Sequence, residues 1–275
     1  MSLAGSRDLT RGNATWNLLH FAVPFLLAFF LQIFYGTVDV IAVGRFGGGS
    51  SDVAAVASGS EVMQLVASLI AGLTTGATVM IGQYYGAKDY RNVRNCIGMT
   101  LTVSFLASVV LTAVMVPMIP RIARWLNTPP EAFEQTVAYG TICSWGIVFI
   151  FGYNALSAIF RGLGNSTAPL IFVGIACVVN ILGDLLLVIV FPLGVTGVAI
   201  ATVLSQALSM VFALVFLFRS DFGFRFQFRE FRITWNLVWL YAKIGVPIGV
   251  QGIIVSLFRM CCCKSVILST IFTPL

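Results

Sequence analysis

The chain has 275 residues, of which 59% are hydrophobic and only 9% are charged, with a formal net charge of +6. A soluble globular domain carries about 25% charged residues, so this composition excludes an ordinary soluble fold and predicts an all-α integral membrane protein. The Lys and Arg residues stand in short clusters between long apolar runs, as juxtamembrane basic residues do. The positive charge therefore does not indicate a nucleic-acid partner, and the expected surroundings are a lipid bilayer.

Apolar stretches long enough for spanning helices, which need about 20 residues each, follow one another along the chain. No Asp, Glu, Lys or Arg occurs between Arg11 and Asp39, so the first stretch is too long for the apolar core of a cleaved signal peptide. The expected helices cover residues 16–43, 52–82, 93–118, 133–160, 168–191 and 195–218, and a seventh begins at Trp235.

The predicted fold is one six-helix transporter lobe followed by a partial seventh transmembrane helix. We assign residues 1–218 to the lobe, residues 219–234 to a basic cytoplasmic linker, and residues 235–275 to the start of a C-terminal lobe. Basic residues are retained in cytoplasmic loops, and a cytoplasmic N-terminus places ten of them inside and three outside. The inside set is Arg7, Arg11, Lys88, Arg91, Arg94, Arg161, Arg219, Arg225, Arg229 and Arg232, and the outside set is Arg45, Arg121 and Arg124. The chain is thus predicted to be a multi-pass plasma-membrane protein.

A short internal repeat pairs the first expected helix with the seventh. Trp16 and Trp239 stand eight residues before Pro24 and Pro247, and a small residue followed by valine precedes each proline. Both segments run outward, which is typical of transporters built from two parallel six-helix halves. Two unrelated proline-containing helices are the alternative.

The repeat stops after Phe258, where the chain continues through three consecutive cysteines, residues 261–263, and ends at Leu275. Nothing in this stretch continues the pattern of the first helix. We therefore expect the second half to be truncated or frameshifted, with a missing C-terminal lobe as its natural partner.

A few polar residues lie at membrane depth, where they are costly and mark ion or proton sites. Asp39 belongs to the first helix, and Asn180 and Asp184 lie one turn apart on one face of the fifth. Because the first and fifth helices rise outward and the sixth descends, these residues and Thr202 reach a similar depth in the outer half. Two carboxylates, an amide and a hydroxyl suit Na⁺ or a shared proton, and Tyr139 of the fourth helix can join them.

Each of these groups also has a local interpretation. Thr202 alone is more typical of a hydroxyl bonded within its own helix, and Asp39 lies near enough to the interface to reach water. Glu61 and Gln64 of the second helix are candidates for lining a cavity, and Pro24 is a candidate hinge because proline removes a helical hydrogen bond. No GxSxG, HExxH, P-loop or Cys/His cluster is present. The sequence therefore supports neither an enzyme nor an ATP-driven pump, and no cofactor is expected beyond a coupling ion.

Over residues 9–258 the chain resembles the multidrug and toxic compound extrusion (MATE) family. The stretches that carry the resemblance are Pro24 with Val38-Asp39, Val43-Gly44-Arg45-Phe46-Gly47, Gly82-Gln83-Tyr84-Tyr85-Gly86-Ala87-Lys88-Asp89, Phe160-Arg161-Gly162-Leu163-Gly164-Asn165-Ser166-Thr167, Asn180-Ile181-Leu182-Gly183-Asp184, and Gly194 to Gly197. The resemblance implies twelve helices in two lobes around a central cavity. It also implies a cation site at Asp39, Asn180, Asp184, Thr202 and Tyr139.

The function that the resemblance implies is antiport, in which Na⁺ or H⁺ enters while an organic cation or drug leaves the cell. Two alternatives stay open: a lipid-linked oligosaccharide flippase of the same superfamily, and an inactive membrane fragment of a transporter. The intramembrane charges are acidic, which favours cationic cargo over a pyrophosphate-linked lipid. The sequence does not discriminate Na⁺ from H⁺, since both suit a pair of carboxylates.

Overall fold

The computed structural model describes residues 13–220 and 235–272, with side chains given for residue 13, residues 15–220 and residues 235–258. The helices, in chain order, are α1 (Ala14–Phe46), α2 (Ser50–Gly86), α3 (Tyr90–Trp125), α4 (Pro130–Trp145), α5 (Ile147–Gly162), α6 (Thr167–Leu185), the π-helical turn η1 (Leu186–Val190), α7 (Gly194–Arg219) and α8 (Trp235–Phe272). Most of the expected linker, residues 221–234, and residues 1–12 lie outside the described part.

The helices are long and apolar enough to confirm the expected membrane architecture. Within the described residues, six helices qualify as membrane spans, and the bent pair α4 and α5 makes a seventh when it is counted as one. This count matches six spans and the beginning of a seventh in the sequence. The expected boundaries agree with the observed helices to within a few residues at most ends.

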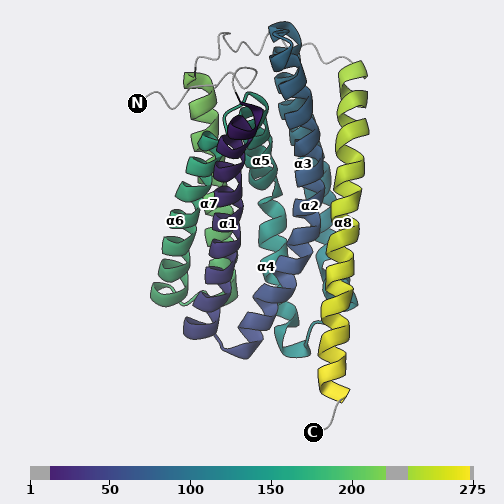
Figure 1. Cartoon of the computed structure of the whole chain (residues 1–275). Coiled ribbons are helices and arrows are strands. Elements are labelled where there is room, and N and C mark those ends of the chain that lie inside the picture. Colours follow the sequence, from purple (N-terminus) through teal and green to yellow (C-terminus); the bar gives the residue numbers. More distant parts are fainter. Residues whose placement is uncertain (1–12, 221–234, 273–275) are drawn as a thin grey trace.

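Successive spans run up and down, so the bundle has two ends (Figure 1). One end of the bundle, here named the proximal end, is where α1 starts. The proximal end also contains the α2–α3 turn at residues 87–89 and the α5–α6 turn at residues 163–166. The distal end holds the α1–α2 turn at residues 47–49, the α3–α4 turn at residues 126–129 and the turn before α7. Both α1 and α8 run from the proximal to the distal end (Figure 1).

Local side-chain bonds explain where several helices begin at the proximal end. The Asn13 carboxamide oxygen accepts from the Thr15 amide at the start of α1, and the Asp89 carboxylate accepts from the Asn92 amide at the start of α3. Asn165 accepts from the amides of Thr167 and Ala168 at the start of α6. Asn and Asp favour these positions because they satisfy amides that lack partners in the first turn.

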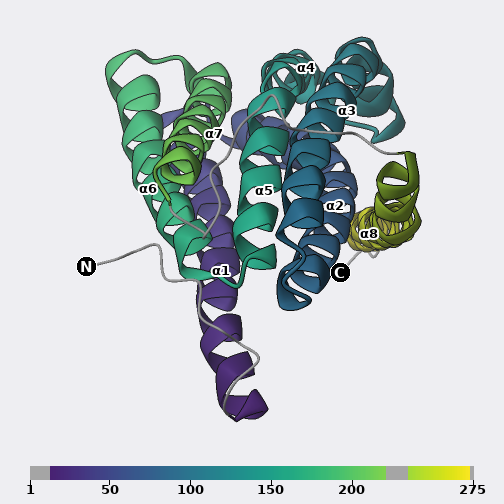
Figure 2. The same cartoon turned by 90° about the horizontal axis from the view of Figure 1, so that it is seen from above.

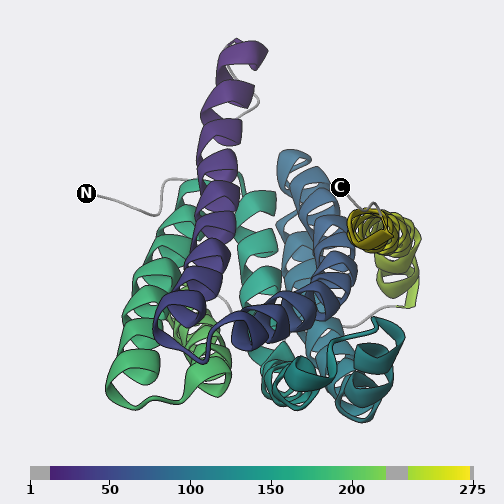
Figure 3. The same ribbon diagram turned by 90° about the horizontal axis from the view of Figure 1, so that it is seen from below.

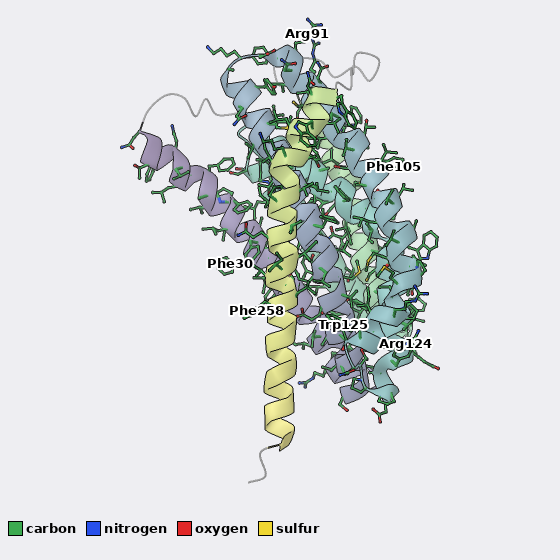
Figure 4. All side chains as sticks on the ribbon, turned by 90° about the vertical axis from the view of Figure 1, so that its right-hand side faces the viewer. Phe30, Arg91, Phe105, Arg124, Trp125 and Phe258 are labelled. Carbon is green, nitrogen blue, oxygen red and sulfur yellow. The ribbon has the colours of Figure 1, made fainter. Side chains whose placement is uncertain are left out.

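Large apolar side chains cover the outside of the bundle. Phe30 is 63% exposed and Phe105 is 59% exposed, and Figure 4 shows Phe105 on α3 between Arg91 near one end and Arg124 near the other. A soluble monomer rarely exposes so much contiguous apolar surface. Apolar flanks between charged ends are what a hydrocarbon layer requires.

Two expected helices are interrupted. The fourth expected span bends by 49° between α4 and α5, at Gly146, where an added Cβ would meet the Val203 side chain at 2.5 Å. Glycine therefore allows α7 to approach the bend closely. The fifth expected span passes from α6 into the π-helical turn η1 after Leu185, the residue that follows Asp184.

The seventh stretch is a continuous helix, α8, that packs along α2 and runs past Phe258 to Phe272. Backbone contacts between glycines allow this packing. An added Cβ at Gly72 would lie 2.1 Å from the Gly249 nitrogen, and one at Gly76 would lie 3.0 Å from the Gly245 nitrogen. Small residues at a helix contact are typical of membrane proteins.

In contrast, the first part of α1 has few neighbours. Figures 2 and 3 show this part projecting from the bundle, while the last part of α1 lies among the other helices. Phe25, Phe29 and Phe34 are 47%, 54% and 57% exposed, whereas Asp39, Ala42 and Val43 are buried. The helix thus enters the bundle at about the level of its polar residues.

Candidate cation-binding site

Asp39 lies in the distal half of α1, where that helix packs along α6 and reaches α7. Its side chain is only 4% exposed, so the alternative of a carboxylate reaching water does not hold for this structure. No basic side chain is among the groups that act on Asp39, which are Asp184, Asn180 and Thr202. The carboxyl group therefore depends on α6 and α7 for its surroundings.

Asn180 and Asp184 face α1 from α6, and both are fully buried. Their separation of four residues places them one above the other on one helix face, as the sequence predicts. Gly183 lies between them, and an added Cβ there would meet the Ala201 side chain at 3.0 Å. This small residue lets α7 pack close beside the two polar side chains.

Thr202 of α7 joins the two sides of the site. Its hydroxyl donates to Asp39 Oδ2 at 3.4 Å and accepts from Asn180 Nδ2 at 3.4 Å. Thr202 therefore does not serve only its own helix, contrary to the local interpretation. Asp39, Asn180 and Thr202 form one hydrogen-bonded chain across three helices.

Asp184 is the fourth residue of the site, and neither of its carboxylate oxygens receives a hydrogen bond. The carboxyl groups of Asp39 and Asp184 lie within hydrogen-bonding reach of each other, but ionised carboxylates can only accept. Both oxygens of Asp184, Oδ1 of Asp39 and Oδ1 of Asn180 are buried and lack a hydrogen-bond donor. Unsatisfied buried polar groups cost about 1–3 kcal/mol each, and charged ones cost more. A cation or a shared proton between the two carboxyl groups would relieve this cost.

The donor set fits a hard monovalent cation better than a transition metal. Among the described residues, no group of three or more His, Cys, Asp and Glu side chains is arranged to hold a metal ion. The oxygens of Asp39, Asp184, Asn180 and Thr202 are the groups that could hold Na⁺, and the two carboxyl groups alone could hold H⁺.

Tyr139 of α4 lies near the site but is not bonded to the four central residues. It is 4% exposed, its ring packs on Gly59 of α2, and its hydroxyl interacts with Cys143 one turn along α4. It is also within electrostatic range of Asp39. Tyr139 therefore borders the site, as a wall between it and α2.

The candidate cavity-lining residues and the hinge occupy other positions. Glu61 is half-buried and Gln64 is exposed, both on α2, and neither is among the groups that act on Asp39. Pro24 lies inside α1, which continues through it as one helix. It stands in the projecting part of α1, at a distance of 15 residues from Asp39.

Two residues that the sequence analysis missed extend the site toward the proximal end. Gln206 Nε2 donates to the Tyr35 hydroxyl at 3.3 Å, and Tyr35 is within electrostatic range of Asp39. Each lies four residues from a site residue, Tyr35 from Asp39 and Gln206 from Thr202. Helical periodicity from the predicted site could have identified them.

Sequence comparison finds relatives that are named as multidrug resistance or multidrug export proteins. The MatE family model matches residues 24–186. The chain is 33% identical over 246 residues to the probable multidrug resistance protein YoeA of Bacillus subtilis (strain 168), a match that covers 86% of this chain and 52% of that protein. It is 23% identical over 248 residues to the multidrug export protein MepA of Staphylococcus saprophyticus, covering 88% of this chain and 55% of that protein.

Solved structures share the arrangement of helices. An outward-facing multidrug resistance MATE family transporter of the MOP superfamily has a TM-score of 0.83 and 26% identity, covering 89% of this chain and 54% of that chain. A MOP superfamily transporter from Pyrococcus furiosus gives a TM-score of 0.83 at 25% identity, covering 89% and 54%. A MATE transporter in the bent conformation gives 0.82 at 25% identity, covering 90% and 55%.

The chain spans about half the length of the curated relatives and solved structures that it matches. The matched half contains the buried acid pair and the helices that carry it. The family model itself covers more than half of this chain, from the proline of α1 to the end of α6. The chain belongs to the MatE family.

Proposed function

We propose that the chain serves cation-coupled antiport, in which Na⁺ or H⁺ enters the cell while an organic cation or drug is exported across the plasma membrane. The observation that carries this proposal is the buried pair of Asp39 and Asp184, in which Asp184 has no donor. Ionisable groups that face a membrane bundle interior are typical of ion pathways and proton relays. The names of the relatives support a drug as the cargo.

The mechanism follows from the charges at the site. When both carboxyl groups are ionised, they repel each other across α1 and α6 and leave acceptors unsatisfied. A bound cation or proton removes this repulsion and stabilises the packing of the distal half of α1 on α6 and α7. An ion shifts the protein between two states only by the difference between its affinities for them. Drug release accompanies that shift.

The projecting part of α1 is the element that moves in this mechanism. It contains Pro24, whose missing amide leaves one helical hydrogen bond unmade. Its side chains are largely exposed within the described residues, so few packing contacts oppose a bend. A solved relative is described in a bent conformation, which is consistent with a flexible element of this kind.

The proposed orientation has the proximal end in the cytoplasm. Basic residues gather at that end more than at the distal end, as expected for the cytoplasmic side. The described proximal residues are Lys88, Arg91, Arg94, Arg161 and Arg219, and the distal ones are Arg45, Arg121 and Arg124. The carboxylate pair then loads from the outside and the N-terminus is cytoplasmic.

A thermal unfolding assay on the purified chain tests the ion site. We expect Na⁺ added in exchange for choline, or a lower pH, to raise the melting temperature of the wild type and to have no such effect on Asp184→Asn. The matched control is Asp52→Asn, because Asp52 is also buried but already accepts from the Gly48 amide at 2.7 Å. An Asp184→Asn variant that responds to both ions like the wild type would remove the assignment of the site.

Dye efflux from cells that express the chain tests transport, with the Na⁺ and pH gradients varied separately. Efflux that follows one gradient and is lost in Asp184→Asn supports antiport and identifies the ion. Ion binding without efflux by this chain would favour a fragment that needs further parts. Movement of a lipid-linked sugar without dye efflux would favour the flippase.

A further inference from the structure

The structure contains a second polar link between α1 and α7, one helical turn on the proximal side of the acid pair. The first link is the bond from the Thr202 hydroxyl to Asp39. The second is the bond from Gln206 Nε2 to the Tyr35 hydroxyl, at 3.3 Å. Both intervals, 35 to 39 on α1 and 202 to 206 on α7, are four residues. The two bonds therefore connect the same faces of the same two helices.

These side chains connect helices whose backbones approach each other at few positions. Along its length α1 packs mainly on α6 and meets α7 far less. Gln206 is only 5% exposed, so its amide is committed to the interior of the bundle. The two side-chain bonds therefore reinforce a helix pair that has little close backbone packing.

The second link lies where α1 leaves the bundle. On its proximal side, Ile33 and Phe34 are 53% and 57% exposed and Phe30 is 63% exposed, and Figure 3 shows this part of α1 projecting away. On its distal side, Asp39 and Ala42 are buried. Tyr35 thus stands between the projecting part of α1, which contains Pro24, and the acid pair.

We propose that Tyr35 and Gln206 are positioning residues that hold α1 on α7 and thereby set the affinity of the acid pair for the coupling cation. The inference rests on the proposed function, since it requires that Asp39 and Asp184 bind a cation. A bend of α1 that pulls Tyr35 from Gln206 withdraws Asp39 from Thr202 and weakens cation binding. A bound cation in turn favours the state in which the second link is made. The link therefore couples the hinge to the site.

The test measures the midpoint of the ion-induced rise in melting temperature for the purified chain. Na⁺ is titrated against choline at constant ionic strength, and protons are tested in a second series. The variants are Tyr35→Phe, which keeps the ring but loses the hydroxyl, Gln206→Met, which keeps the length but loses the amide, and the double variant. We expect each single variant to need about twofold to tenfold more ion, the equivalent of one net hydrogen bond. The double variant should add little, since both groups act through one bond.

The matched control is Ser209→Ala, which removes another buried hydrogen bond of α7. That hydroxyl donates to the Phe172 carbonyl on α6 at 2.9 Å, so its loss weakens α7 without touching α1. We expect a lower melting temperature without ligand and an unchanged midpoint. If Tyr35→Phe and Gln206→Met behave like this control, their role is structural only and the inference is overturned.

The outcomes separate the inference from the proposed function. If Asp184→Asn loses the ion-induced rise in melting temperature while Tyr35→Phe and Gln206→Met keep the wild-type midpoint, the ion site is supported and the positioning role is wrong. If neither Na⁺ nor protons stabilise the wild type, the ion site and the positioning role are both wrong. If the single variants shift the midpoint and the double variant shifts it by the sum, the two residues act independently and the proposed link is wrong.

Discussion

Replacing Gly72 by alanine tests the contact that holds α8 on α2. An added Cβ at this position would lie 2.1 Å from the nitrogen and 2.2 Å from the Cα of Gly249. These are backbone atoms of the neighbouring helix, so no side-chain rotation can make room. Only a separation of the two helices would relieve the overlap.

The expected magnitude follows from two opposing effects. Alanine in a helix interior is favoured over glycine by roughly 0.5–1 kcal/mol, whereas overpacking a close contact costs about 1–3 kcal/mol or more. Gly36→Ala is the matched control, because nothing lies within 4 Å of an added Cβ there. The preference for alanine in a helix is common to both variants, so the difference between their unfolding free energies measures the cost of the overlap at Gly72. We expect this cost to be about 3 kcal/mol because backbone atoms overlap.

The assay is thermal unfolding of the two variants in one detergent, together with a cross-link that reports on the contact itself. The hydroxyls of Ser68 and Ser256 lie 2.9 Å apart across α2 and α8, so cysteines at these positions should form a disulfide. We expect Gly72→Ala to melt lower than Gly36→Ala and to reduce the cross-linked fraction. Equal melting temperatures and equal cross-linking in the two variants would show that the glycine contact does not hold α8.

Two further predictions concern the ends of the bundle. Asp52→Ala removes the carboxylate that accepts from the Gly48 amide at 2.7 Å and should lower the free energy of unfolding by about 0.5–2 kcal/mol. The control is Asp52→Asn, which keeps an acceptor, and the two variants are compared by denaturation. Equal stability of the two variants would contradict the prediction. Phe25→Leu removes the ring that lies 5.7 Å from the Arg161 guanidinium carbon and should cost about 0.5–1 kcal/mol. Phe25→Tyr should retain that stability, and an equal loss in both variants would point to packing instead.

The spans and the central polar residues could be predicted from the sequence because both depend on local or one-dimensional properties. A spanning helix requires only a sufficient apolar length, and the common face of Asn180 and Asp184 follows from helical periodicity alone. Helix direction then places Asp39 and Thr202 at a matching depth. The structure confirms this convergence through the bonds of Thr202 to Asp39 and Asn180.

Other features of the helices depend on their neighbours, and the sequence analysis missed them. The bend at Gly146 accompanies the close approach of Val203. Asp52, expected only as the first residue of the second helix, closes the α1–α2 turn by accepting from the Gly48 amide. At Gly146 a contact with another helix decides the local structure, and at Asp52 a hydrogen bond across one turn does.

What the sequence by itself determined was the number of spans, their alternation and the presence of acidic groups at one depth. Only the tertiary structure decided how each helix is rotated and which side chains consequently meet. It joined Tyr35 to Gln206, set Tyr139 against Gly59 and left Asp184 beside Asp39 without a donor. The physical reason is that apolar length and depth are properties of one helix, whereas a hydrogen bond across two helices requires their relative rotation, which packing sets.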